Sequence, residues 1–272
     1  MKLLQVIQKI LPKHKYAINA ALLGDSSEYA WSNLGFWQEG DSYPQACQNL
    51  ADHLIRNLNL NSKDRLLDLG VGYGASILYW RENYLIENIQ AIELQENYVK
   101  SLKEKELENF EIVQESYLNL KHIPFKFKFD VIVCLDSAYH CSLNLFLDSV
   151  TSVLNSKGRI GFHTLILSEK WNTLTTIQKQ QYTWLLKSAD IKLKNLNSKQ
   201  EIEINLMKFE FKQIEIEDLS KSVLLGFSNY VEQQLICDQK GIDYFKIKMT
   251  AKLCHKLFKD GFVLYVQVTA KQ

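Results

Sequence analysis

The segment 66–74, with the sequence LLDLGVGYG, joins an apolar run to a carboxylate and to three alternating glycines. Its leucines predict a short buried strand, and the apolar residues within 75–80 predict the start of a helix. Glycine accepts positive φ and lets a ligand approach the backbone, while the first turn of the helix offers free N–H groups. The pattern therefore predicts a strand-to-helix turn that holds a small cofactor. The three glycines are Gly70, Gly72 and Gly74.

The acidic residues near this turn bear on which cofactor it holds. The spacing Gly70-x-Gly72-x-x-Ala75 also satisfies the dinucleotide fingerprint, so the glycines alone do not exclude a nicotinamide cofactor. Asp68 would repel a diphosphate but attract the sulfonium and ammonium groups of S-adenosylmethionine. Glu93 follows the apolar segment 89–92, where a carboxylate can accept both hydroxyls of a ribose. The two carboxylates favour S-adenosylmethionine.

Each acidic residue also has a structural interpretation. Asp68 could cap a helix or lie in a solvated turn, and Glu93 could complement the dipole of the charged helix expected at 95–108. We expect that replacing either residue by alanine weakens cofactor binding at little cost in folding.

With these residues the chain resembles the class I S-adenosylmethionine-dependent methyltransferases, whose motif is acidic-x-Gly-x-Gly-x-Gly. Residues 129–135, FDVIVCL, resemble the fourth strand of that family, and residues 154–165 resemble its turn and fifth strand, with Lys157 in place of a usual glycine. The flanking segments resemble the group that methylates polyketides, macrolides and phenols. These segments are residues 33–54, 214–231 and 262–272.

The resemblance implies roles for residues at the strand ends. Ribose would bind at Glu93, adenine would lie at the loop after the third strand, and the methyl donor would lie beside the end of the fourth strand. Many relatives have a Gly-Asp-Ala type segment after the third strand, where this chain has Glu115-Ser116-Tyr117. The residues expected to bind the cofactor are Asp68, Gly70, Gly72, Gly74, Glu93, Leu94, Ser116, Tyr117, Asp136, Trp37 and Tyr29.

A hydroxyl acceptor benefits from a base, and imidazole has a suitable pKa near neutral pH. His140 is the first candidate because it follows the predicted fourth strand, and His163 within the predicted fifth strand is the second. The alternative for His140 is a residue that lines the pocket without moving a proton. A nucleophilic pair of His140 with Cys141 is disfavoured, because adjacent residues on a turn seldom point at each other.

Composition narrows the class of protein. A net charge of +1 provides no basic stripe for a nucleic acid. Five scattered cysteines indicate neither a disulfide framework nor a metal site, so we expect no metal and a cytoplasmic location. No segment reaches the ~18 apolar residues of a membrane span. Residues 3–11 have the spacing of an amphipathic helix, which we expect to pack on the domain.

Strands and helices alternate through residues 65–165, which predicts an α/β fold with a doubly wound, mostly parallel sheet. The resemblance implies seven strands in a Rossmann-like methyltransferase sheet. We expect one methyltransferase domain over residues 1–272. Its parts are an N-terminal helical cap (1–60), a cofactor-binding core (61–167), a helical substrate-lid insertion (168–210) that begins with a helix at 171–186, and closing strands and helices (211–272).

We therefore expect an enzyme that transfers a methyl group from S-adenosylmethionine to a small molecule, most simply to a hydroxyl by in-line displacement. Carbon and nitrogen acceptors are the nearest alternatives. An NAD(P)-dependent oxidoreductase and a noncatalytic cofactor-binding protein are two further ones. A homodimer stays open as the oligomeric state.

Overall fold

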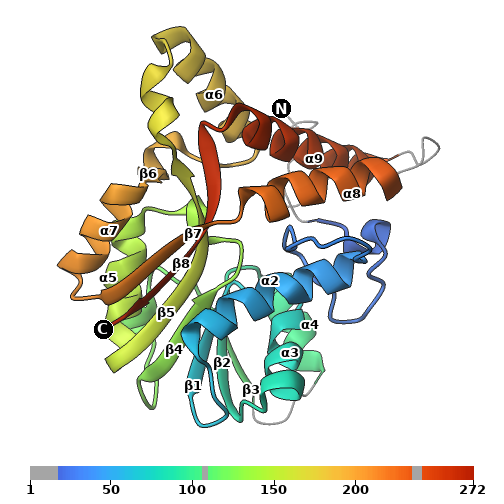
Figure 1. Ribbon diagram of the computed structural model, residues 1–272. Coiled ribbons are helices and arrows are strands. Elements are labelled where there is room, and N and C mark those ends of the chain that lie inside the picture. Colours follow the sequence, from blue (N-terminus) through green and yellow to red (C-terminus); the bar gives the residue numbers. More distant parts are fainter. Residues whose placement is uncertain (1–17, 106–109, 235–240) are drawn as a thin grey trace, which may run out of the picture.

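The apolar segments expected as strands lie side by side in one sheet. A computed structural model describes residues 18–105, 110–234 and 241–272 of the chain (Figure 1). The strand order is β3-β2-β1-β4-β5-β8-β7, and the short β6 pairs with β5. The strands are β1 (Arg65–Leu69), β2 (Asn88–Glu93), β3 (Phe110–Gln114), β4 (Phe129–Cys134), β5 (Leu154–Leu167), β6 (Asn197–Ser198), β7 (Lys212–Asp218) and β8 (Val263–Lys271).

The pairing pattern confirms the predicted sheet. β1 pairs in parallel with β2 on one side and with β4 on the other, so that Leu66 lies opposite both Ile89 and Val131. β8 runs antiparallel between β5 and β7. The sheet is therefore a mostly parallel, doubly wound one, with the two-residue β6 added to the seven expected strands. The carboxyl ends of β1 to β4 meet at one edge, which we call the cofactor edge.

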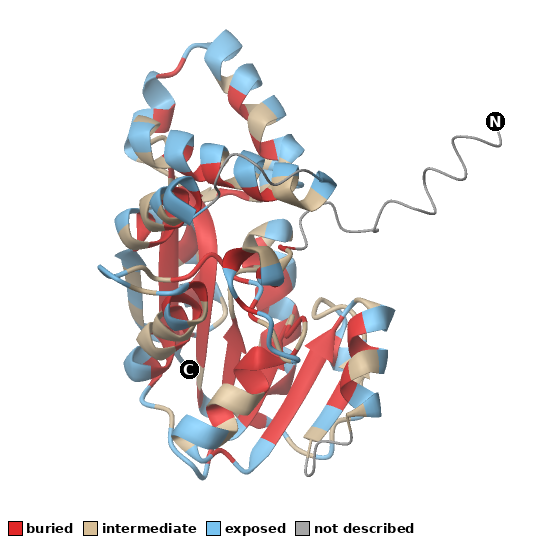
Figure 2. Ribbon diagram, turned by 90° about the vertical axis from the view of Figure 1, so that its right-hand side faces the viewer, coloured by how far each residue is buried: buried red, intermediate tan, exposed pale blue. Residues whose placement is uncertain are grey.

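Helices cover both faces of the sheet, and each face has its own apolar core (Figures 1 and 2). One core includes α2, α3, α8 and α9, and the other includes α5 and α7. The α-helices are α2 (Tyr43–Leu58), α3 (Ala75–Tyr84), α4 (Glu96–Glu104), α5 (Leu143–Val153), α6 (Thr176–Ser188), α7 (Lys199–Lys208), α8 (Gly226–Gln234) and α9 (Ile242–Asp260).

Short helical turns complete the description. They are η1 (Ala20–Leu23), η2 (Leu120–His122), η3 (Ala138–His140), η4 (Glu169–Thr173), η5 (Leu193–Asn195) and the π-helical η6 (Lys221–Leu225). Of these, η3 directly follows β4 and so lies at the cofactor edge.

Local sequence explains where the helices begin. The α2 helix starts with a capping box between Ser42 and Gln45, and α6 starts with one between Thr175 and Gln178. Lys157 has a φ of 70°, which is a conformation that favours glycine and agrees with its place at a usual glycine position.

The segment expected as a substrate lid divides into two parts in the structure. The predicted helix at 171–186 is η4 followed by α6. The later helix α7 instead lies on the sheet, where Ile202 and Leu206 are buried in the same core as α5. A role of residues 168–210 as a substrate lid stays a prediction, and α6 is a part of it that does not pack in the core of α5. Within the predicted cap, residues 1–17 lie outside the described residues, and α2 packs on β5 and β8.

The close approach of α2 to β5 can be tested. A Cβ on Gly161 of β5 would lie 2.6 Å from Leu58 Cδ1 and 2.8 Å from Leu54 Cδ1, both on α2. We predict that Gly161→Ala lowers the free energy of unfolding by about 1–3 kcal/mol, because two buried leucines must move. Urea unfolding measures this change. Ser156→Ala at an exposed position of β5 is the control, and an equal effect of both substitutions would contradict the packing.

Candidate functional site

The glycine turn connects β1 to α3 at the cofactor edge. Gly70, Gly72 and Gly74 have φ values of 76°, 54° and 89°, a region that other residues rarely adopt. The amide of Gly70 donates to the carbonyl of Ile92 at 2.8 Å, which joins the turn to the end of β2. A Cβ on Gly72 would lie 3.0 Å from Ser32 Oγ. The backbone of the turn is therefore closely surrounded, and the amides of Gly70, Gly72 and Gly74 all donate hydrogen bonds within the protein.

Glu93, the last residue of β2, binds this turn directly. Its Oε2 accepts a hydrogen bond from the amide of Gly72 at 2.9 Å, and its Oε1 accepts one from the amide of Gln95 at 2.9 Å. The second bond lies at the start of α4, which agrees with the alternative that Glu93 complements the dipole of this helix. Each carboxylate oxygen retains a lone pair, so Glu93 can still accept hydroxyl groups. The neighbouring Leu94 is 55% exposed and offers an apolar surface beside it.

Asp68 lies behind the turn, with only 1% of its surface exposed. Its Oδ2 accepts a hydrogen bond from the indole Nε1 of Trp80 on α3 at 2.8 Å. Burial raises the pKa of Asp68 to about 6, and hydrogen bonds from Ser76 and Trp80 oppose this rise. Asp68 thus fastens α3 to β1 and places its charge beneath the glycines. The expectation of little folding cost on its replacement does not fit this burial.

Asp136 connects three parts of the chain at the end of β4. Its Oδ2 accepts from the amide of Leu34 at 2.8 Å, and its Oδ1 accepts from the hydroxyls of Tyr139 at 3.1 Å and Tyr265 at 2.9 Å. Burial raises the pKa of the Asp136 carboxyl to about 6. Its φ of 49° is strained for a residue other than glycine. Three donors therefore hold Asp136 in a conformation that its own backbone disfavours.

His140 ends η3 and is exposed. Its Nδ1 lies 3.4 Å from the carbonyl oxygen of Asp190, and its own carbonyl accepts from Asn195 Nδ2 at 3.1 Å. Both partners belong to the segment after β5, so His140 lies where that segment meets the cofactor edge. His163 is fully buried, and desolvation lowers its pKa to about 3. His163 is therefore neutral at physiological pH and poorly suited to accept a proton.

The loop after β3 lies beside β4. Tyr117 donates from its hydroxyl to the carbonyl of Ser137 at 3.2 Å, and Ser116 Oγ accepts from the amide of Leu118 at 3.2 Å. Glu115 accepts from the amide of Ser116, and this bond is the main cause of its lowered pKa. The predicted adenine loop is therefore folded back on itself at the cofactor edge.

The segment 24–42 between η1 and α2, which we call the cover segment, carries the two predicted aromatic contacts. The Tyr29 ring lies under the ammonium group of Lys105, 3.8 Å from its centroid. Trp37 donates to the carbonyl of Leu34 at 2.8 Å and stacks on Tyr230 at 4.2 Å. These contacts attach the cover segment to α4 and α8. The structure thus gives both rings a packing role, and their contact with the cofactor stays a prediction.

Sequence reasoning missed Tyr265 and the hydroxyls of Ser32 and Ser137. A Cβ on Gly70 would lie 3.0 Å from Ser137 Oγ, so both serines border the glycine turn. Tyr265 lies in the centre of β8 and is fully buried. No motif marks any of the three, although Ser137 could have been found from its place after Asp136.

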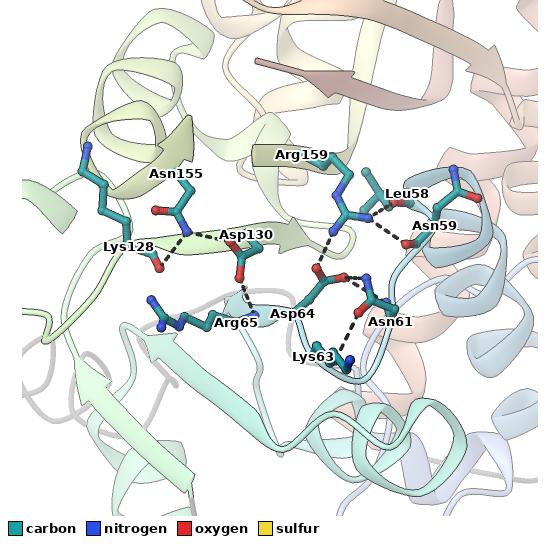
Figure 3. Close-up of polar contacts among 10 residues, drawn as sticks. All are labelled: Leu58, Asn59, Asn61, Lys63, Asp64, Arg65, Lys128, Asp130, Asn155 and Arg159. Carbon is teal, nitrogen blue, oxygen red and sulfur yellow. Dashed lines mark hydrogen bonds and ion pairs between the residues drawn. The ribbon is translucent and has the colours of Figure 1, made fainter. Parts of the chain in front are cut away.

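A hollow of about 770 Å³ lies at the opposite edge of the sheet, near the amino ends of β1 and β4 (Figure 3). Arg159 spans it, donating to the carbonyls of Leu58 and Asn59 at 2.7 Å each and to Asp64 at 2.6 Å. Asp130 accepts from the amide of Arg65 at 3.0 Å. These groups satisfy one another, and open α/β sheets bind ligands at the other edge. The hollow is therefore not the candidate site.

Known proteins resemble this chain in sequence. A family model described as mycolic acid cyclopropane synthetase matches residues 17–260. Erythromycin 3''-O-methyltransferase from Saccharopolyspora erythraea is 31% identical over 119 residues, which is 42% of this chain. The match spans 39% of the length of that relative.

Solved structures resemble the fold over almost its whole length. The cyclopropane synthase MmaA2 from Mycobacterium tuberculosis has a TM-score of 0.75 at 17% identity, covering 97% of this chain and 99% of that chain. Geranyl diphosphate methyltransferase, in complex with GPP and sinefungin, has a TM-score of 0.71 at 14% identity. The match covers 97% of this chain and 98% of that chain. CmaA1, complexed with SAH and CTAB, has a TM-score of 0.73 at 17% identity and covers 93% of each chain.

The Glu93 contacts lead to a binding prediction. Glu93→Ala removes the acceptor of the Gly72 amide and the expected acceptor of the ribose hydroxyls, so affinity for S-adenosylhomocysteine should fall at least tenfold, or about 1.4 kcal/mol. Titration calorimetry measures the affinity. Glu104→Ala on the exposed end of α4 is the matched control and should leave it unchanged. A loss of less than about twofold at Glu93 would refute its assignment to the cofactor.

The burial of Asp68 leads to a prediction about pH. Because the folded pKa is raised to about 6, Asp68 contributes stability that is present at pH values below about 4 and is lost as the pH rises through 6. Asp68→Asn carries no charge to bury. Its free energy of unfolding, relative to wild type, should rise by about 2 kcal/mol between about pH 4 and pH 7. Urea unfolding across this range measures the difference, which would not vary with pH if Asp68 were solvated.

Proposed function

The chain belongs to the mycolic acid cyclopropane synthetase family of S-adenosylmethionine-dependent methyltransferases, and from this we propose that it methylates a hydroxyl group of a small molecule. The observation that carries the proposal is the arrangement at the cofactor edge, where Glu93 holds the glycine turn at Gly72. The name of the erythromycin O-methyltransferase supports oxygen as the acceptor atom. Family membership also disfavours the nicotinamide and noncatalytic alternatives.

The residues at the cofactor edge fit the cofactor. The glycines let a ligand approach the backbone of the turn, Glu93 retains lone pairs for the ribose, and the exposed Leu94 can cover one face of the adenine. When bound, S-adenosylmethionine supplies an electrophilic methyl group on a positively charged sulfur. The buried carboxylate of Asp68 beneath the turn provides negative charge that favours such a cation over a diphosphate.

We assign the role of base to His140. When its Nδ1 carries the proton and donates to the carbonyl of Asp190, Nε2 is the basic nitrogen of the neutral ring. Asp136 is the weaker candidate, because both of its oxygens already accept hydrogen bonds from three donors. Asp136 therefore positions the cover segment and η3, while His140 takes the hydroxyl proton of the acceptor as the new carbon–oxygen bond forms.

The acceptor atom can be determined directly. The purified chain is incubated with S-adenosylmethionine carrying a carbon-13 methyl group and with a metabolite extract, and labelled products are found by mass spectrometry. The carbon-13 chemical shift of the methyl group then distinguishes oxygen, nitrogen and carbon acceptors. We expect a methyl ether. A label on carbon would favour the chemistry of the cyclopropane synthases among the structural neighbours.

The role of His140 is tested by substitution. His140→Ala should lower kcat for a hydroxyl acceptor by at least tenfold, because a positioned base contributes about 10²–10⁴ in rate. Affinity for S-adenosylhomocysteine should not change. His122→Ala, on an exposed turn, is the control. Unchanged turnover at His140 would make it a residue of the pocket wall.

A further inference from the structure

The outer face of α9 carries an apolar stripe in contact with solvent. Ile242 and Phe245 are each 61% exposed, and Met249 is 46% exposed. Their spacing of three and four residues places them on one side of the helix. The opposite side packs against α8 and β8, and Figure 1 shows α8 and α9 side by side. The buried residues of α9 are Ile247, Ala251, Cys254 and Leu257. Within residues 18–105, 110–234 and 241–272, the helix is thus packed on one face, while the apolar stripe on the other face is exposed.

Positive charge surrounds this stripe. The helix contains five lysines and only two acidic residues, although the whole chain has a net charge of +1. Both acidic residues are engaged, Asp243 with Lys246 at 3.5 Å and Asp260 with Lys256 at 2.7 Å. Lys248 and Lys252 are exposed beside Met249. The face therefore combines apolar side chains with excess positive charge. The lysines are Lys246, Lys248, Lys252, Lys256 and Lys259.

The N-terminal residues of the chain are poor candidates to cover this stripe. Asn19 donates to Asp243 at 3.2 Å, so the described chain begins beside the first turn of α9. The preceding residues 1–17 contain four lysines and no acidic residue. Like charges would oppose their packing against a lysine-rich face. A negatively charged surface would instead be attracted to the lysines of α9.

We propose that the outer face of α9 binds the anionic surface of a lipid bilayer, with Ile242, Phe245 and Met249 inserted at the headgroup boundary. Helices with an apolar stripe flanked by lysines bind in the plane of such interfaces. Each lysine near an anionic surface contributes about fivefold in affinity. In the described part of the chain, no helix is long and apolar enough to cross a membrane, so the contact is a peripheral one. The proposal does not depend on the acceptor of the methyl group.

Vesicle binding tests the proposal with the full chain. Vesicles of phosphatidylcholine alone and vesicles that also contain phosphatidylglycerol are sedimented with the protein, and the bound fraction is measured. We expect at least tenfold stronger binding to the anionic vesicles, weakened by added salt. The triple variant I242S/F245S/M249S should lose at least tenfold of that binding. The matched control I204S/M207S changes two exposed apolar residues of α7 and should bind as the wild type does.

Three results would overturn the proposal. They are no binding of the wild type to anionic vesicles, equal binding by the wild type and the triple variant, and equal loss in the α7 control. One alternative is that residues 1–17 cover the apolar stripe of α9. If so, deleting them should create vesicle binding that the full chain lacks. The other alternative is that a second copy of the chain covers the stripe. Light scattering would then show a dimer of the wild type and a monomer of the triple variant.

Discussion

Carboxylates that accept hydrogen bonds from distant parts of the chain hold the cofactor edge together. Glu93 binds the amides of Gly72 and Gln95, which fixes the glycine turn against the start of α4. Asp136 binds the amide of Leu34 and the hydroxyls of Tyr139 and Tyr265. Among the described residues these carboxylates accept hydrogen bonds without forming an ion pair, so their negative charge remains at the site when they are ionised. Asp136 in particular depends on its bonds, because its left-handed backbone is strained.

Buried carboxyl groups with raised pKa values are found where the chemistry is expected. The residues with left-handed backbone at this edge include the three turn glycines and Asp136, which has no glycine-like freedom. The same edge contains the buried Asp68, whose pKa is raised to about 6. At the opposite edge the charged groups are paired with one another, as Arg159 and Asp64 are. The sheet thus has one edge built for packing and one with carboxylates that lack a cationic partner.

Family membership and the geometry constrain different aspects of function. The match over residues 17–260 identifies the methyl donor and the class of enzyme. The contacts of His140 with Asp190 and Asn195 connect the proposed base to the segment after β5. That this segment and the cover segment select the acceptor is a proposal, based on the general rule that loops carry specificity. The lysine-rich outer face of α9 is a further surface, and it depends neither on the cofactor edge nor on the choice of acceptor.

The sequence by itself determined the features that depend on local sterics and on alternation. The positions of the glycine turn and of the parallel strands follow from short-range rules, because only glycine readily adopts these φ values and because buried parallel strands require apolar runs. Only the tertiary structure decided which carboxylate faces the site. Asp68 is buried against Trp80 while Glu93 reaches the turn, and Asp136 is held by Tyr265, 129 residues away. Such partners are brought together by the packing of distant strands and helices, and no local pattern in the sequence encodes that proximity.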